Sequence, residues 1–330
     1  MLSSILLDIL LPILVMVALG AWLRWTFKVD LSTLTKINIY LFVPAFVFDK
    51  VATSKLPWSD MGGVVLVTLI HVAALGIIVW GIGRLFGVGR KTLAAIALAV
   101  MFYNSGNFGL PLAELAYPEG RAVAANGLPK NGGAVQAFVV LTQNVLTFTL
   151  GLGIAAAAHH TSILSVFVRI LRLPVLYVLA AALGARLWLD AAPGRVLPTL
   201  IAKPAEYLAA GLVPIALVTL GAQLASRPRW PRWKPVSLVL LLRLIYGPAQ
   251  MAALLWGFHV MGWGALDLWP WPAEMLVLTA AVPTAVNTLL LTLELDGDAE
   301  LAADCVFWTT VFSCVTITGW LVVIQLMSSP

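Results

Sequence analysis

Residues 99–115 read AVMFYNSGNFGLPLAEL, and this stretch decides the fold. It lies in an apolar run, yet eight consecutive positions hold Asn104, Ser105, Gly106, Asn107, Gly109 and Pro111. Proline lacks an N–H and clashes with the preceding turn, so the helix should break before Pro111. Non-helical backbone at membrane depth survives only inside protein or beside water, so the break predicts a cavity. The alternative is a packed proline kink whose asparagines bond neighbouring helices.

A second interrupted segment, LTAAVPTAVNTLLLTLEL, occupies residues 278–295, with Pro283 near its middle and polar neighbours at Thr279, Thr284, Asn287 and Thr288. After each break a new half-helix begins, and its first N–H groups are unpaired and partly positive. Two such ends that meet at mid-membrane make a site for an anion without any Arg or Lys. We find no basic residue near either break in the sequence, so we expect an anion held by amide dipoles.

The composition is that of an integral membrane protein. Hydrophobic residues make up 61% of the chain and charged residues 11%, whereas about 25% of a soluble protein is charged. A bilayer core of about 30 Å needs roughly 20 apolar residues per helix. The sequence therefore predicts an all-α membrane protein with ten transmembrane helices, at residues 4–25, 34–54, 61–86, 92–117, 133–158, 163–189, 205–226, 236–263, 271–295 and 301–327.

The basic residues lie in short clusters between these spans, so the net charge of +5 is not a nucleic-acid footprint. Twelve of them lie at the odd-numbered connections and seven at the even-numbered ones. The largest cluster is RPRWPRWKP at residues 227–235. Because cytoplasmic loops carry an excess of Lys and Arg, we expect the odd-numbered connections inside and both termini outside.

The positions of four prolines indicate a duplicated half. Pro44 and Pro214 lie 170 positions apart (214 − 44), and Pro111 and Pro283 lie 172 apart (283 − 111). Both pairs join predicted helix n to helix n+5. Because five is odd, a repeat of five spans inserts upside down relative to its copy, which is typical of secondary transporters.

Two further polar positions are candidates for the site. Gln143 and Asn144 are adjacent in the fifth predicted helix, so they point about 100° apart, and we expect Gln143 to face the site. Glu114 lies three residues after Pro111, in the first turn of the expected half-helix. There it would be either stabilised as a carboxylate by the helix dipole or used as a proton carrier.

The remaining reactive side chains predict no chemistry. His71 and His259 are single histidines on apolar helices, where a satisfied packing role is expected, and Cys305 and Cys314 share one apolar segment. No HExxH, Walker A, GxSxG or CxxC pattern occurs. We therefore expect no catalytic residue, no metal site and no cofactor.

The stretches NSGNFGLPLAELAYP (104–118) and PTAVNTLLLTLELDGDAELAA (283–303) closely resemble the two crossing-helix signatures of the auxin efflux carrier family. That family includes plant auxin exporters and bacterial permeases for malate, malonate and related acids. LTQNVLTFTLGLGIA (141–155) and LVPIALVTLGAQLA (212–225) resemble its fifth and seventh helices, so the resemblance runs over essentially the whole chain. The chain lacks the long cytoplasmic loop of the plant exporters. The additional asparagine at Asn107 makes this motif resemble that of the bacterial branch.

The resemblance implies two inverted five-helix repeats in which helices four and nine are broken and cross at their prolines. Residues 1–60 and 161–230 would form a scaffold that dimerises, and residues 61–160 and 231–330 a transport domain. In the plant exporters, an asparagine seven residues before the crossing proline and a glutamine in the fifth helix contact the substrate carboxylate. Those positions match Asn104 and Gln143.

These observations predict a secondary transporter of small organic anions, such as carboxylates or auxin-like acids, that works by alternating access. Two alternatives are a cation–proton antiporter, which would need paired acidic residues at the crossing, and a membrane receptor without transport. We expect a homodimer in the bacterial cytoplasmic membrane, in contact with lipid and without a nucleic-acid partner. The candidate substrate-binding residues are Asn104, Ser105, Asn107, Pro111, Gln143, Pro283, Thr284 and Asn287, with Glu114 as the candidate for proton coupling.

Overall fold

The computed structural model describes residues 7, 11–118, 130–156, 174–192, 194–225, 230–294 and 297–327, and this part of the chain is helical without strands. Six of its helices are long and apolar enough to cross a membrane: 31–52, 58–85, 132–155, 199–224, 233–260 and 299–326. The chain is therefore an integral membrane protein, as predicted. The other predicted spans hold shorter or interrupted helices, so the count of ten stays a prediction.

Parts of five predicted spans lie outside the described residues, namely residues 4–6, 8–10, 157–158, 163–173, 226 and 295. The uninterrupted helices are α2 (Leu11–Phe27), α5 (Trp58–Leu85), α11 (Pro174–Asp190), α12 (Thr199–Leu224) and α17 (Ala299–Met327). Three long helices contain a π-helical segment, namely α3 (Leu31–Ile37) with η2 (Asn38–Phe42) and α4 (Val43–Ala52); α8 (Gly132–Leu146) with η4 (Thr147–Gly151) and α9 (Leu152–Ala156); and α13 (Trp233–Leu240) with η5 (Leu241–Tyr246) and α14 (Gly247–Val260). Such segments are frequent at functional sites.

Two segments are interrupted helices. The first comprises α6 (Arg90–Met101), non-helical residues 102–104, the π-helical η3 (Ser105–Gly109) and α7 (Leu110–Ala116). The second comprises α15 (Ala273–Ala280), non-helical residues 281–285 and α16 (Val286–Glu294), and it follows the short 3₁₀ helix η6 (Gly264–Leu266). Non-helical backbone is therefore present in both stretches where the composition predicted it.

The first interruption does not lie directly before Pro111. It begins at Phe102, and Pro111 is the second residue of α7. The Asn104 side chain caps η3 by accepting a hydrogen bond from the Asn107 N–H, so Asn104 fixes the place where helical backbone resumes.

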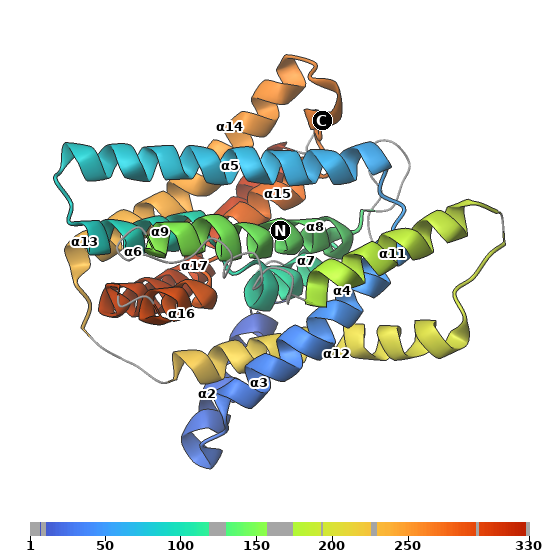
Figure 1. Ribbon diagram of the computed structural model, residues 1–330, viewed down its shortest axis with the longest axis horizontal. Helices are drawn as coiled ribbons and strands as arrows, with labels where there is room; N and C mark the ends of the chain where they lie inside the picture. The colour runs from blue at the N-terminus through green and yellow to red at the C-terminus, as the bar shows by residue number, and fades with distance from the viewer. Residues whose placement is uncertain are drawn as a thin grey trace.

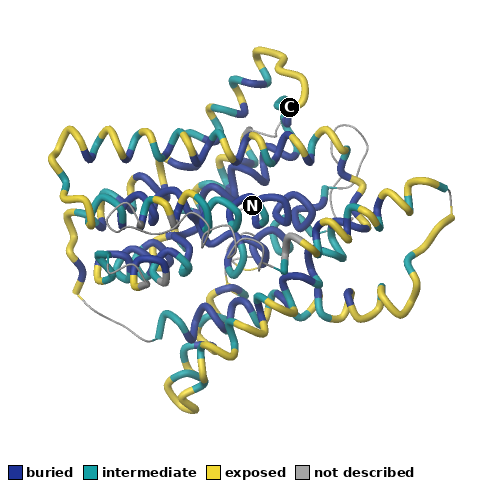
Figure 2. Tube along the Cα trace, in the orientation of Figure 1, coloured by how far each residue is buried: buried dark blue, intermediate teal, exposed yellow. Residues whose placement is uncertain are grey.

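The helices pack in two groups (Figure 1). One group contains α2, α4, α11 and α12, and the other contains α5, α6, α8 and α13–α17. The interrupted segment η3–α7 lies between them, since it packs on both α12 and α8. The buried residues concentrate at the centre, and the outward faces of α2, α5 and α12 are exposed (Figure 2). The non-helical backbone is thus enclosed by protein, as a membrane requires.

Within the first group, α2 and α12 cross with their backbones in contact at two glycines. A Cβ atom on Gly20 would collide with the carbonyl oxygen of Val218, and one on Gly221 would collide with that of Val17. Small residues at a crossing allow this close approach between membrane helices.

Candidate functional site

The two interrupted helices meet through their backbones. Tyr103 and Thr284 form an isolated antiparallel bridge. The Asn104 N–H donates to the Pro283 carbonyl at 2.8 Å, and the Ala285 N–H donates to the Phe102 carbonyl at 3.0 Å. Each break therefore satisfies backbone groups that the other leaves unpaired. We call this contact between residues 102–105 and 283–285 the junction.

Buried side chains hold the junction together. Gln136 of α8 donates from Nε2 to the Ser105 carbonyl at 2.8 Å, and its Oε1 accepts from the Thr279 hydroxyl at 2.6 Å. The Thr284 hydroxyl donates to the Ala99 carbonyl at 2.8 Å. Gln136 therefore ties one interrupted helix to the other, a role that sequence analysis did not assign to it.

The two asparagines of the first break are linked. Asn104 Oδ1 accepts from the Asn107 N–H at 3.1 Å, while the buried Asn104 Nδ2 has no hydrogen-bond partner. Asn107 Oδ1 accepts from Nδ2 of Asn38 at 2.7 Å. Because Asn38 belongs to η2, the long helix 31–52 reaches a predicted site residue through a buried polar side chain.

Gln143 lies on α8 and is 2% exposed. It lies beside the Tyr103 hydroxyl, but neither its two polar atoms nor that hydroxyl makes a hydrogen bond of normal geometry within the described residues. With Asn104 Nδ2, these atoms are buried polar groups with unused hydrogen-bonding capacity. Leaving such a group unpaired costs about 1–3 kcal/mol, so a polar ligand would be stabilised here.

The other predicted site residues differ in their contacts. Pro283 joins the junction through its carbonyl, and Thr284 through its backbone bridge and its hydroxyl. Ser105 takes part through its carbonyl, which Gln136 bonds. Pro111 is buried in α7, and Asn287 is half-buried at the start of α16. The structure thus brings four predicted residues directly together: Asn104, Ser105, Pro283 and Thr284.

The predicted position of Glu114 in the first turn of a half-helix was wrong. Helical backbone begins at Ser105, and Glu114 is the third residue from the end of α7. Its carboxylate lies 3.4 Å from Nζ of Lys50 on α4. Glu114 therefore forms an ion pair with α4, which belongs to the group of α2, α4, α11 and α12. It lies away from the positive helix N-terminus that was expected to stabilise it.

The expectation that no basic residue lies near the breaks was also wrong. The side chain of Arg243, in η5, is completely buried and donates to the carbonyls of Val100, at 2.7 Å, and Ala280. These carbonyls belong to the C-terminal turns of α6 and α15. The guanidinium carbon also lies 4.7 Å from the centre of the Tyr103 ring. Arg243 is 143 positions from Val100 in the chain, so spacing within either break could not reveal it.

His71 of α5 lies in the same region, with its ring centre 6.4 Å from that of Tyr103. It is completely buried and neither ring nitrogen has a hydrogen-bond partner. The expected satisfied packing role therefore does not describe His71. His259, by contrast, contacts Asp267 at 2.9 Å.

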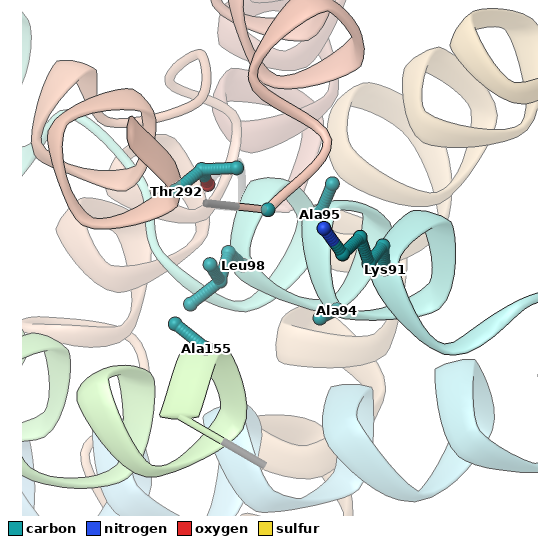
Figure 3. Close-up of a pocket in the computed structure, with 7 residues that line it drawn as sticks. Lys91, Ala94, Ala95, Leu98, Ala155 and Thr292 are labelled. Atoms are coloured by element: carbon teal, nitrogen blue, oxygen red, sulfur yellow. The ribbon is translucent and has the colours of Figure 1, made fainter. Parts of the chain in front are cut away.

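The two cysteines, Cys305 and Cys314, are free thiols. Across the described ranges, no group of three or more His, Cys, Asp or Glu residues could hold a metal ion. A small hollow lies elsewhere, between α6, α9 and the end of α16 (Figure 3). Its lining consists of Lys91, Ala94, Ala95, Leu98, Ala155, Thr292 and Gly297. None of the predicted substrate-binding residues lines it.

Comparisons with known proteins agree with a membrane function. A family model described as membrane transport protein matches residues 5–164 and 161–321. An uncharacterized transporter of Methanothermobacter thermautotrophicus is 25% identical, covering 96% of this chain and 98% of its own. A protein of Rhizobium meliloti, provisionally described as a malonate transporter, is 27% identical over 87% of this chain and 85% of its own.

Proposed function

Because the chain belongs to the membrane transport protein family, the auxin efflux carrier family that its signatures resemble, we propose that this membrane transporter is a secondary carrier of small organic anions. The substrate binds at the junction between the two interrupted helices. Carboxylates are the leading class, and the relative provisionally described as a malonate transporter supports a small dicarboxylate as the first ligand to try.

The observation that carries the proposal is the set of buried, unpaired amide groups at the junction. Asn104 Nδ2 and Gln143 Nε2 are donors without a partner in the described structure, and a carboxylate is acceptor-only. Glu114, the acid nearest to this break in the sequence, is already paired with Lys50. The junction therefore offers hydrogen bonds to an anion and no neighbouring carboxylate from Glu114 to repel it.

Alternating access would move the two helix groups against each other. In this proposal residues 1–60 and 161–230 form a dimerising scaffold, and residues 61–160 and 231–330 form a transport domain. Each of the two inverted five-helix repeats contributes helices to both. The Asn38–Asn107 and Lys50–Glu114 contacts link the two groups. They would have to break and re-form in each cycle.

A cation–proton antiporter is the weaker alternative. Such a protein needs an acid at the crossing to bind its cation, whereas Arg243, a basic residue, bonds the helix ends next to this junction. Uptake of labelled substrate into vesicles separates a carrier from a membrane receptor, because a receptor without transport would show no uptake.

The proposal predicts that Asn104→Ala and Gln143→Ala each weaken malonate binding by about 1–3 kcal/mol, because each leaves one carboxylate oxygen without its donor. Titration calorimetry of the purified protein measures the change. Thermal unfolding without ligand should stay close to that of the parent for Gln143→Ala, whereas Asn104→Ala also removes the cap of η3 and should lower stability by about 0.5–2 kcal/mol.

The matched control is Asn144→Ala, one residue further along α8 and pointing about 100° away. It should bind malonate as the parent does. If Asn104→Ala and Gln143→Ala bind as tightly as the parent while Asn144→Ala does not, the site lies on another face of α8.

A further inference from the structure

Arg243 carries a charge that no acid balances within the described residues. Its hydrogen bonds go to two backbone carbonyls, and its Nε atom has no partner. By comparison, the buried Arg186 bonds the Leu56 carbonyl and also lies 3.5 Å from the carboxylate of Asp190. A charge at membrane depth is costly, and it persists where it has a function or strong local compensation.

The compensation for Arg243 comes from the ends of two helices. Val100 lies in the last turn of α6, and Ala280 is the last residue of α15. The C-terminus of a helix carries roughly half a negative charge on its free carbonyls. Two such ends together offset about one positive charge, which matches one guanidinium group.

This pairing changes the charge of the whole junction. An interrupted helix presents one negative and one positive end at its break, so two interrupted helices would contribute about zero net charge. Arg243 cancels the two negative ends, and the junction is left with a positive charge of about one. The field is strong because Arg243 is completely buried, and buried charges are poorly screened.

A second observation points to a ligand at the same place. Tyr103, whose ring covers the Arg243 guanidinium, is 1% exposed, and its hydroxyl lies beside Gln143 without a hydrogen bond of normal geometry. His71 and Gln143, both next to Tyr103, also have unpaired polar atoms and are 0% and 2% exposed. These groups include O–H and N–H donors of the kind that an anion accepts from.

We propose that Arg243, acting through its field rather than by direct contact, sets the charge selectivity of the carrier and makes the junction prefer a dianion over a monoanion of the same size. The inference rests on the proposed function, and it adds the residue that selects the substrate by charge. Each additional negative charge on the substrate is stabilised by the same positive field, so the binding affinity rises with the charge.

The experiment compares malonate with malonamate, in which an amide replaces one carboxylate, and succinate with succinamate. At an effective dielectric of about 20, one charge acting over about 6–10 Å changes affinity roughly 10- to 100-fold. The parent should therefore bind each dianion at least about 10-fold more tightly than its half-amide. Arg243→Gln keeps an N–H donor for the carbonyls but removes the charge, so this ratio should fall about 10-fold or more.

Two further variants separate charge from packing. Arg243→Lys keeps the charge and should keep the preference for the dianion. Arg186→Gln is the matched control, because Arg186 is also buried, bonds a carbonyl at 2.6 Å and lies 4.7 Å from a ring, that of Trp58. It should leave the ratio unchanged. A purely structural role for Arg243 would weaken both ligands of a pair equally.

The inference is overturned if Arg243→Gln keeps the parental ratio, or if the parent binds a dianion and its half-amide equally well. The second measurement needs no variant, so it decides even where Arg243→Gln fails to fold. A parent that binds none of the four compounds and moves no organic anion contradicts the proposed function itself.

Discussion

The ion pair between Lys50 and Glu114 bears on how transport is driven. Its side chains are 13% and 21% exposed, and the charged atoms are 3.4 Å apart. The pair joins α4 to α7, so Glu114 matches a contact between the helix groups better than it matches a proton carrier.

We expect Glu114→Gln still to transport malonate, because glutamine keeps the size of the side chain and removes only its charge. Its response to an imposed proton gradient should be the same as that of the parent. Uptake into proteoliposomes, with and without the gradient, measures both quantities. Glu206→Gln, which removes the exposed Lys203–Glu206 pair, is the control. Transport that continues but ignores the gradient would identify Glu114 as the proton carrier.

Single residues also mark the limit of sequence reasoning. Asn104 and Pro283 could be predicted because their neighbours in the chain are unusual for an apolar span. Arg243 could not be placed in the same way, because its partners are carbonyls of two other helices. A signal did exist: Arg243 lies inside the predicted span 236–263, seven residues after its start. An ionised group there is a functional hypothesis in itself.

Among the elements, the crossing of α2 and α12 depends on two glycines. Replacing Gly221 by Ala would place a methyl group against the Val17 carbonyl, and backbone at a helix crossing cannot move aside without separating the helices. Overpacking of this kind costs about 1–3 kcal/mol. Gly221→Ala should therefore lower the thermal unfolding temperature of the detergent-solubilised protein.

Gly81→Ala provides the comparison, because a Cβ atom at Gly81 of α5 meets nothing within 4 Å. An alanine there should raise stability by about 0.5–1 kcal/mol, since glycine in a helix loses more entropy on folding. Equal unfolding temperatures for the two variants would show that α2 and α12 can separate without cost.

The elements show which structural features the sequence specifies. Long apolar helices follow from hydropathy, and the interruptions follow from clustered Gly, Asn and Pro. The exact end of the first interruption does not follow, because Asn104 fixes it by capping η3 and by bonding Pro283. Such a partner becomes visible only when both helices are placed in space. The π-helical segments η2, η4 and η5 had no predicted counterpart for the same reason.

For the molecule as a whole, the charge of the connections predicts its orientation in the membrane. The turn after α5 and the connection between α11 and α12 lie at opposite ends of the structure (Figure 1). Phe86 and Val196 are exposed at these two ends, at 72% and 76%. The predicted topology puts Phe86 inside the cell and Val196 outside.

Cysteine labelling in intact cells measures this orientation. In a background that lacks Cys305 and Cys314, Val196→Cys should react with a membrane-impermeant reagent, and Phe86→Cys should react only after the cells are opened. The reverse pattern would place the odd-numbered connections outside and invert the assignment of both termini.

The hydrogen bond from Asn104 to Pro283 also constrains how a ribosome can make this protein. The two residues are 179 positions apart (283 − 104). At about 5–20 residues per second, Pro283 is synthesised roughly 10–35 s after Asn104. During that interval the backbone at residues 102–104 has no partner from the later helix, and bare lipid cannot supply one. The insertion machinery must therefore shelter the first interrupted helix from lipid until the second arrives.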